Sequence, residues 1–227
     1  MNYKHALIFY RTVTPLHVGC GQAVGVVDLP VIRERATGYP FIPGSGIRGS
    51  LRDIFENMGN GNKELTLKLF GPDNEDMGEP ENQYAGSLAI HDARLLFFPV
   101  RADKEVFLWI TCPLAVQRYN RDRAAFQLGD PFDLSGLTTI NAGNFIGPAA
   151  LGTAPQDSLH LEEFLFTPAI VDDPVRERLQ KLSIDVGNKT GLAELGSRTV
   201  LLSDRSFYHF VNHATMLMQH NTLTSAK

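Results

Sequence analysis

The stretch YPFIPGSGIRGSLR, residues 39–52, carries most of the information about how this chain folds. Its short apolar run Phe41-Ile42 lies between two prolines and is followed by glycines, a pattern typical of a strand that turns directly into a helix. Apolar residues then recur at helical spacing, at Ile47, Leu51, Ile54 and Phe55. The spacing predicts a helix over 44–57 with one buried face.

The start of this predicted helix, Gly44-Ser45-Gly46-Ile47-Arg48-Gly49, matches the pattern G-x-G-x-x-G. Glycines allow a ligand to approach the backbone closely, and the amide groups at a helix N-terminus attract phosphate. Arg48 and Arg52 lie one turn apart and add positive charge to one face. We interpret the segment as a phosphate-binding site for a polynucleotide.

Two other interpretations of the glycine pattern remain open. A dinucleotide-binding fingerprint has the same spacing, but Pro43 directly precedes the glycines here. The acid expected about twenty residues further on is also missing from a strand end, because Glu64 falls in a predicted helix. The simplest alternative is a glycine-rich turn that begins a core helix and binds nothing.

Runs of β-branched and aromatic residues elsewhere predict strands, and helical spacing predicts further helices. The expected strands are 5–13, 87–100, 106–111, 159–166 and 199–202, with extended chain over 24–32. The expected helices are 44–57, 62–70, 113–128, 174–182 and 204–220. This order indicates an α+β protein, compatible with a ferredoxin-like sheet that has helices on one face.

Composition predicts one cytoplasmic domain. The 227 residues are 43% hydrophobic and 20% charged, and we expect neither a membrane span nor a signal peptide. Two cysteines in unrelated contexts form no zinc-type pair, which favours a reducing compartment. The net charge of −4 does not exclude RNA binding, because residues 73–81 hold five acids and no base.

The loop over 14–30 contains two residues that are able to carry chemistry. Asp28 follows Gly25 and precedes Pro30, and a carboxylate on such a loop is able to bind a metal ion or transfer a proton. His17 is a second candidate. Each residue alone is more often structural or solvated than catalytic.

Several short runs, in this order along the chain, together resemble the repeat-associated mysterious protein (RAMP) superfamily. They are TPLHVG at 14–19, VVDLPVIRE at 26–34, YPFIPGSGIRGSLR at 39–52, LFGP at 69–72, LEEF at 161–164 and LSDRSF at 202–207. The run AGSLAIHDARLL at 85–96, with FPVR at 98–101, narrows the resemblance to the backbone subunits of type III-B CRISPR effectors, the Cmr complexes.

This resemblance implies a modified RNA-recognition-motif-like fold, with insertions that form a thumb. Copies of such a subunit stack with each other and with other Cmr subunits along a guide RNA. The implied RNA-binding residues are Arg33, Ser45, Gly46, Arg48, Gly49 and Arg52. The thumb displaces a base of the guide–target duplex at regular intervals, and its candidate here is the long irregular stretch 129–157 within a single domain over 1–227.

The resemblance also assigns the cutting of target RNA to Asp28, with Mg²⁺ or Mn²⁺ as the bound metal and His17 as a weaker catalytic candidate. A displaced nucleotide is able to place its 2′-hydroxyl in line with its own phosphate, so one carboxylate and a metal ion suffice. Family members continue into a glycine-rich C-terminal segment, and we expect that segment to be missing after residues 222–227.

Three other functions are compatible with these residues. The chain is either a catalytically silent RNA-binding subunit of the filament, an endonuclease that matures the guide transcript with His17 as acid–base catalyst, or a nicotinamide enzyme built on 44–49. The Asp28 loop and the run at 85–96 favour the backbone subunit over the maturation endonuclease, the nicotinamide enzyme ranks last, and the silent subunit remains the main alternative.

Overall fold

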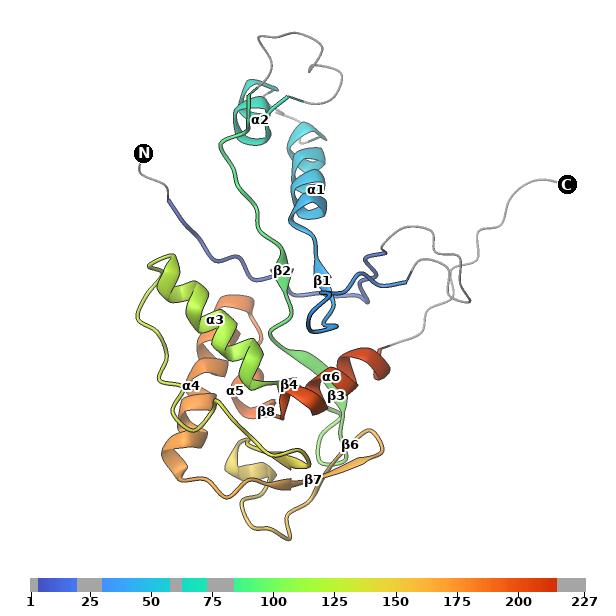
Figure 1. Cartoon of the computed structure of the whole chain (residues 1–227), viewed down its shortest axis with the longest axis vertical. Helices are drawn as coiled ribbons and strands as arrows, with labels where there is room; N and C mark the ends of the chain where they lie inside the picture. The colour runs from blue at the N-terminus through green and yellow to red at the C-terminus, as the bar shows by residue number, and fades with distance from the viewer. Residues whose placement is uncertain (1–3, 20–29, 58–62, 73–83, 216–227) are drawn as a thin grey trace, which may run out of the picture. The chain divides into compact units, whose positions relative to one another are not determined.

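The computed structural model describes residues 4–19, 30–57, 63–72 and 84–215. These residues divide into two compact units, whose elements are labelled in Figure 1. The larger unit holds Met1–Leu16, Arg35–Tyr39 and Leu95–Lys227, and the smaller unit holds His17–Glu34 and Pro40–Arg94. The smaller unit is thus built from two insertions into the larger one. The single domain expected over 1–227 stays a prediction.

The larger unit is organised around a three-stranded sheet. Its strands are β3 (Phe98–Arg101), β4 (Phe107–Thr111) and β8 (Thr199–Leu201), in the order β3-β4-β8. The strand β3 pairs antiparallel with β4, and β8 pairs parallel with it. In the central strand, Leu108 and Ile110 are fully buried while Phe107 and Trp109 are half-buried, so both faces of the sheet are covered.

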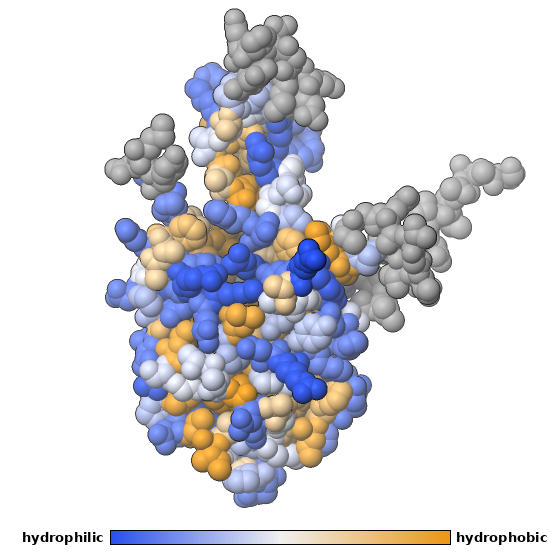
Figure 2. Space-filling model, viewed as in Figure 1, coloured by the Kyte–Doolittle hydropathy of each residue, from blue (hydrophilic) through white to orange (hydrophobic). Residues whose placement is uncertain are grey.

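Helices cover both faces of this sheet, and not one face as predicted. They are α3 (Pro113–Ala125), α4 (Asp173–Thr190), α5 (Leu195–Arg198) and α6 (Asp204–His213). Val200 of β8 belongs to the same apolar cluster as Phe207 of α6, whereas its neighbour Leu201 belongs to the cluster of Leu182 in α4. Successive strand residues point to opposite faces, so α6 and α4 lie on different sides. Figure 2 shows polar and apolar side chains mixed over the visible face of this unit.

A second small sheet completes the larger unit. It contains β5 (Asn144–Phe145), β6 (Leu159–Leu161) and β7 (Phe164–Pro168), in the order β5-β7-β6. The single strand predicted over 159–166 is therefore wrong, because the chain turns at Glu162, which has a φ of 48°.

The stretch 129–157 combines an irregular backbone with buried side chains. It contains β5 and a 3₁₀ turn at Ala149–Leu151, and it contributes Leu137, Phe145 and Ile146 to the core. Its assignment as the thumb stays a prediction.

The smaller unit contains β1 (Phe41–Ile42), α1 (Gly44–Asn57), α2 (Lys63–Phe70) and β2 (Ala93–Arg94). The helix predicted over 44–57 is confirmed with its bounds, and the helix predicted over 62–70 is confirmed from Lys63, because residue 62 lies outside the described residues. The strands β1 and β2 pair antiparallel. Ile47 and Phe70 are buried, and the Phe55 ring lies 5.7 Å from that of Phe70.

Other predicted elements need correction. Residues 5–13 form no strand; Leu7 and Phe9 instead pack against the cluster that contains Tyr119 of α3, without a partner strand among the described residues. The single strand predicted over 87–100 is wrong: this stretch contains two short strands, β2 and the start of β3. The helix predicted over 174–182 continues to Thr190, because Val186 extends its buried face, and ends at Gly191 with a φ of 71°.

The predicted helix 204–220 is confirmed to His213, and residues 216–220 lie outside the described part. Within the described residues, none of the helices has the length and apolar character that crossing a membrane requires.

Candidate functional site

The first residue of α1 is packed tightly inside the smaller unit. The Gly44 amide donates a hydrogen bond to Oδ1 of Asp92 at 2.8 Å. A Cβ atom at Gly44 would lie 2.4 Å from the carbonyl oxygen of Ile90, so a side chain has no room here. A glycine at this position therefore allows two backbone segments to pack closely together.

Most backbone amides at the N-terminal end of α1 already donate hydrogen bonds to other groups of the protein. The Pro43 carbonyl accepts hydrogen bonds from the amides of Gly46 and Ile47, at 3.0 and 3.1 Å. With the Gly44 bond to Asp92, three of the first four helical amides have partners. The Asp92 carboxylate also places a negative charge at this end, which favours the helix and opposes a phosphate at the same place.

The side of α1 offers a more accessible surface than its end. Ser45, Gly46 and Gly49 are exposed, and a Cβ atom built on either glycine would meet no other atom within 4 Å. Packing does not explain these two glycines, and each costs a helix about 1 kcal/mol relative to alanine. An open glycine surface allows a ligand to reach the helix backbone. The predicted phosphate contact is therefore best placed on this side.

The two arginines of the motif hold the C-terminal end of α2. Nη2 of Arg48 donates to the carbonyl of Phe70, and Nη1 of Arg52 donates to the carbonyl of Gly71 at 3.1 Å. Nε of Arg52 also pairs with Glu56 at 2.7 Å. A guanidinium group has five N–H donors, so one such bond does not use up the donors of Arg48. Arg48 is exposed, whereas the Arg52 side chain is only 19% exposed.

The remaining carbonyls at this end of α2 also have partners. The Lys68 carbonyl accepts the Ser87 amide at 2.9 Å, and the Leu69 carbonyl accepts the Leu88 amide at 3.0 Å. The two arginines thus complete a fully hydrogen-bonded helix end, which gives them a structural role that the sequence did not reveal. On the exposed surface of α2, the hydrogen bond from Lys68 lowers the pKa of Glu64.

The predicted cleavage residue Asp28 lies outside the described residues, but both ends of its loop belong to the smaller unit. Gly19 and Val31 form an antiparallel bridge, and the Ile32 amide donates to the Val18 carbonyl at 2.8 Å. These contacts join residues 18–19 to 31–32 at the base of the loop.

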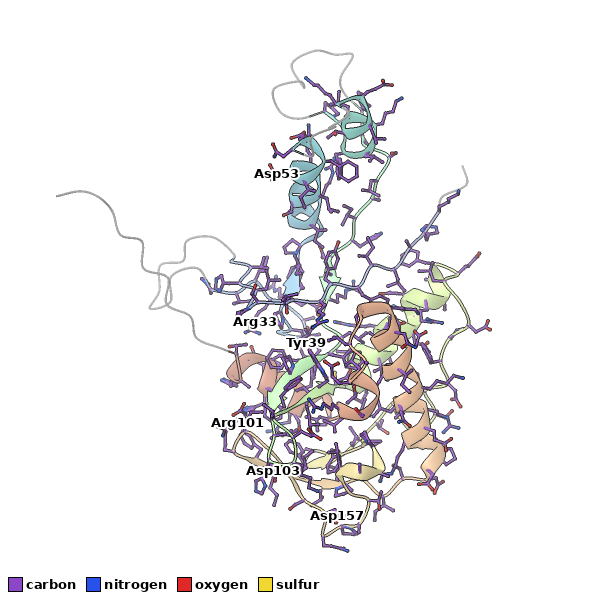
Figure 3. The ribbon with its side chains drawn as sticks, turned by 180° about the vertical axis from the view of Figure 1, so that it is seen from behind. Arg33, Tyr39, Asp53, Arg101, Asp103 and Asp157 are labelled. Atoms are coloured by element: carbon purple, nitrogen blue, oxygen red, sulfur yellow. The ribbon has the colours of Figure 1, made fainter. Side chains whose placement is uncertain are left out.

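The two other predicted residues near this base are described. His17 is exposed, and Arg33 is half-buried with its backbone bridged to Pro40. Figure 3 shows Arg33 near β1 and Asp53 on α1. The helix that carries the predicted phosphate contacts and the base of the predicted cleavage loop thus lie in one compact unit.

Sequence reasoning missed the contacts that hold this site. Gly44 and Asp92 meet across 48 residues of chain, and Nε of Arg94 lies 3.8 Å from Oε1 of Glu34. Neither the Gly44–Asp92 contact nor the Arg94–Glu34 contact could be predicted from a local sequence pattern. In the described part of the chain, no group of three or more His, Cys, Asp or Glu residues is arranged to hold a metal ion.

The comparisons with known proteins agree with this architecture. Residues 9–223 match the family model of the RAMP superfamily, and the chain belongs to this superfamily. Over 119 residues it is 41% identical to the CRISPR system Cmr endoribonuclease Cmr4 of Pyrococcus furiosus, a match covering 52% of this chain and 39% of the relative. Over 90 residues it is 29% identical to the CRISPR system Cms endoribonuclease Csm3 of Mycobacterium tuberculosis, covering 37% of this chain and 38% of the relative. The chain thus matches about two fifths of the length of these curated relatives.

Solved structures show the same fold. The crystal structure of oligomeric Cmr4 from Pyrococcus furiosus matches 89% of this chain and 71% of its own, with a TM-score of 0.69 and 27% identity. A cryo-EM structure of the type III-B Cmr-beta complex bound to cognate target RNA matches 88% of this chain and 66% of its own, with a TM-score of 0.60. The latter shares 20% identity and supports the fold alone. The mixed α and β architecture and the resemblance drawn from the sequence are both confirmed.

Proposed function

We propose that this chain is the guide-RNA-binding backbone subunit of a type III-B CRISPR effector and cleaves complementary target RNA at regular intervals. The supporting observation is the 41% identity over 119 residues to an endoribonuclease named Cmr4. Stacking with further copies of itself and with other Cmr subunits, an RNA-recognition-motif-like core with a thumb over 129–157, and a cytoplasmic location belong to the same proposal.

Guide RNA binds along the open side of α1 in this proposal. A phosphate reaches the helix backbone beside Gly46 and Gly49, where no side chain blocks it. The Ser45 hydroxyl and the guanidinium groups of Arg48 and Arg52 donate hydrogen bonds to the phosphate, and Arg33 adds a positive charge. Phosphate contacts of this kind carry no sequence information, which suits a subunit that must accept any guide.

Target cleavage is assigned to Asp28. A thumb that unstacks one target nucleotide allows the 2′-oxygen to attack the adjacent phosphorus in line with the leaving 5′-oxygen. The new P–O bond forms as the P–O5′ bond breaks, the 2′-hydroxyl proton passes to a base, and the leaving 5′-oxygen takes up a proton from water. The Asp28 carboxylate is suited to hold Mg²⁺ or Mn²⁺ or to accept that proton, and His17 is the weaker candidate for proton transfer. When bound, the metal ion supplies positive charge against the phosphate.

The test is cleavage of end-labelled complementary RNA by the reconstituted complex. We expect a ladder of products at regular spacing with Mg²⁺ or Mn²⁺, and no products with a chelator. Intact RNA in every lane would instead identify a silent structural subunit. Cutting that survives the chelator would retain the nuclease and remove the metal from the proposal.

A further inference from the structure

The short strand β2 and the residue before it contact both functional parts of the smaller unit. On one side, Oδ1 of Asp92 accepts the Gly44 amide at the start of α1, at 2.8 Å. On the other, Nε of Arg94 lies 3.8 Å from Oε1 of Glu34. Glu34 follows the base of the Asp28 loop, which is closed by the bridge between Gly19 and Val31.

We propose that Asp92 and Arg94 are positioning residues, which hold the guide-binding helix and the base of the cleavage loop in a fixed relation. The inference rests on the proposed function, since it assumes that α1 binds guide RNA and that the loop cuts target RNA. It adds that neither residue needs to touch RNA to control cutting.

The connection to α1 leaves little freedom along the chain. The strands β1 and β2 pair in one register, with Phe41 opposite Arg94 and Ile42 opposite Ala93. Only Pro43 separates β1 from the helix. Because a Cβ atom at Gly44 would lie 2.4 Å from the Ile90 carbonyl, the helix start already touches the segment before β2. The Asp92 bond then fixes the direction in which α1 leaves the strand pair.

The connection to the loop base combines a backbone contact with an ion pair. Arg33 bridges Pro40 through its backbone, and the neighbouring Glu34 meets Arg94. The side chains of Arg94 and Glu34 are 44% and 18% exposed, and a pair this exposed stabilises a fold only weakly. In the proposal, the pair acts by orienting the loop base rather than by stabilising the fold.

Placement matters because in-line attack has a narrow geometric tolerance. A displacement of about 1 Å away from the reacting atoms is able to slow a reaction by about a hundredfold. Loss of either contact should therefore slow cutting while leaving the RNA-binding surface of α1 intact.

The test compares Asp92→Ala and Arg94→Glu with matched controls in the reconstituted complex. The controls are Asp103→Ala and Arg101→Glu in the larger unit, both outside the proposed thumb (Figure 3). Asp103 also accepts a backbone amide, from His160 at 3.1 Å. Arg101 also pairs with a glutamate, Glu162, at 3.5 Å.

We expect both test variants to slow cutting at saturating target by about tenfold or more, and guide and target affinities to stay within about twofold. Asp92→Asn keeps an acceptor oxygen and should recover most of the rate, as should the charge exchange of Glu34→Arg with Arg94→Glu. The control variants should cut like the unchanged protein.

Equal cutting by all variants would overturn the inference and leave the proposed function standing. A loss of cutting that only follows a loss of guide binding, or that neither rescue repairs, would overturn it as well. If the unchanged protein fails to cut, both the inference and the proposed function fall.

Discussion

Each of the two units of this chain is stabilised internally by a different kind of interaction. The larger unit buries apolar side chains on both faces of its central sheet, whereas among the described residues of the smaller unit only Ile47, Phe70 and Pro72 bury an apolar side chain. The smaller unit depends instead on polar contacts from Arg48, Arg52 and Asp92 to backbone groups. Residues that a sequence identifies as functional are therefore also structural there, and a test of function has to separate the two roles.

The largest expected effect lies in the core of the larger unit. Phe207 is fully buried, and its ring lies 5.0 Å from that of Tyr39. Phe207→Ala should lower the free energy of unfolding by about 3–5 kcal/mol, because it leaves a cavity. Phe70→Ala should instead expose amides of the smaller unit alone to hydrogen exchange. Equal losses of global stability in urea titrations would contradict the difference between the units.

Within the smaller unit, the glycines of α1 differ in the same way: Gly44 is packed against backbone, whereas Gly46 lies on an open surface. Gly44→Ala forces a methyl group against the Ile90 carbonyl and should destabilise the smaller unit by about 1–3 kcal/mol. Gly46→Ala meets no neighbouring atom and should stabilise the helix by about 0.5–1 kcal/mol. The same variant should weaken guide RNA binding if phosphate approaches this side. Hydrogen exchange and RNA titration measure the two effects, and unchanged RNA affinity of Gly46→Ala would remove this surface from the site.

Arg48 should show its two roles separately. Arg48→Ala leaves the Phe70 carbonyl without its partner and should cost about 1 kcal/mol in the smaller unit. If Arg48 also contacts a guide phosphate, the slope of log affinity against log salt should shrink by about one. Arg178→Ala is the matched control, because Arg178 likewise donates to a backbone carbonyl, that of Ser135. A salt slope that Arg48→Ala leaves unchanged would make this arginine structural alone.

The smallest expected effect is at Cys112 in the larger unit. Burial raises the pKa of this thiol to about 12, so it stays protonated at neutral pH. With Cys20 changed to serine, a thiol reagent at pH 8 should leave the folded protein unmodified and react fully only in denaturant. Rapid labelling of the folded protein would show that the core of the larger unit opens readily.

Local patterns predicted the helices better than the strands. The helix over 44–57 was predicted with its bounds, because apolar spacing and the glycines before it are both local signals. The strand over 5–13 failed because strand-forming residues need a partner, and the turn at Glu162 carries no glycine to announce it. The site was predictable only as a list of residues. The bond between Gly44 and Asp92 spans 48 residues, so its existence depends on the fold.

The most direct test of the central claim is target cleavage by Asp28→Asn in the reconstituted complex, measured together with guide binding and target capture. Asparagine keeps the shape and one carbonyl oxygen but loses the charge that holds a cation or accepts a proton. We expect cutting to fall by about a hundredfold or more while guide binding and target capture stay nearly unchanged. Because the sequence predicts a loop position for Asp28, stability should change by less than about 0.5 kcal/mol. Cutting by Asp28→Asn at the rate of the unchanged protein would contradict the assignment and leave a subunit that binds RNA without cleaving it.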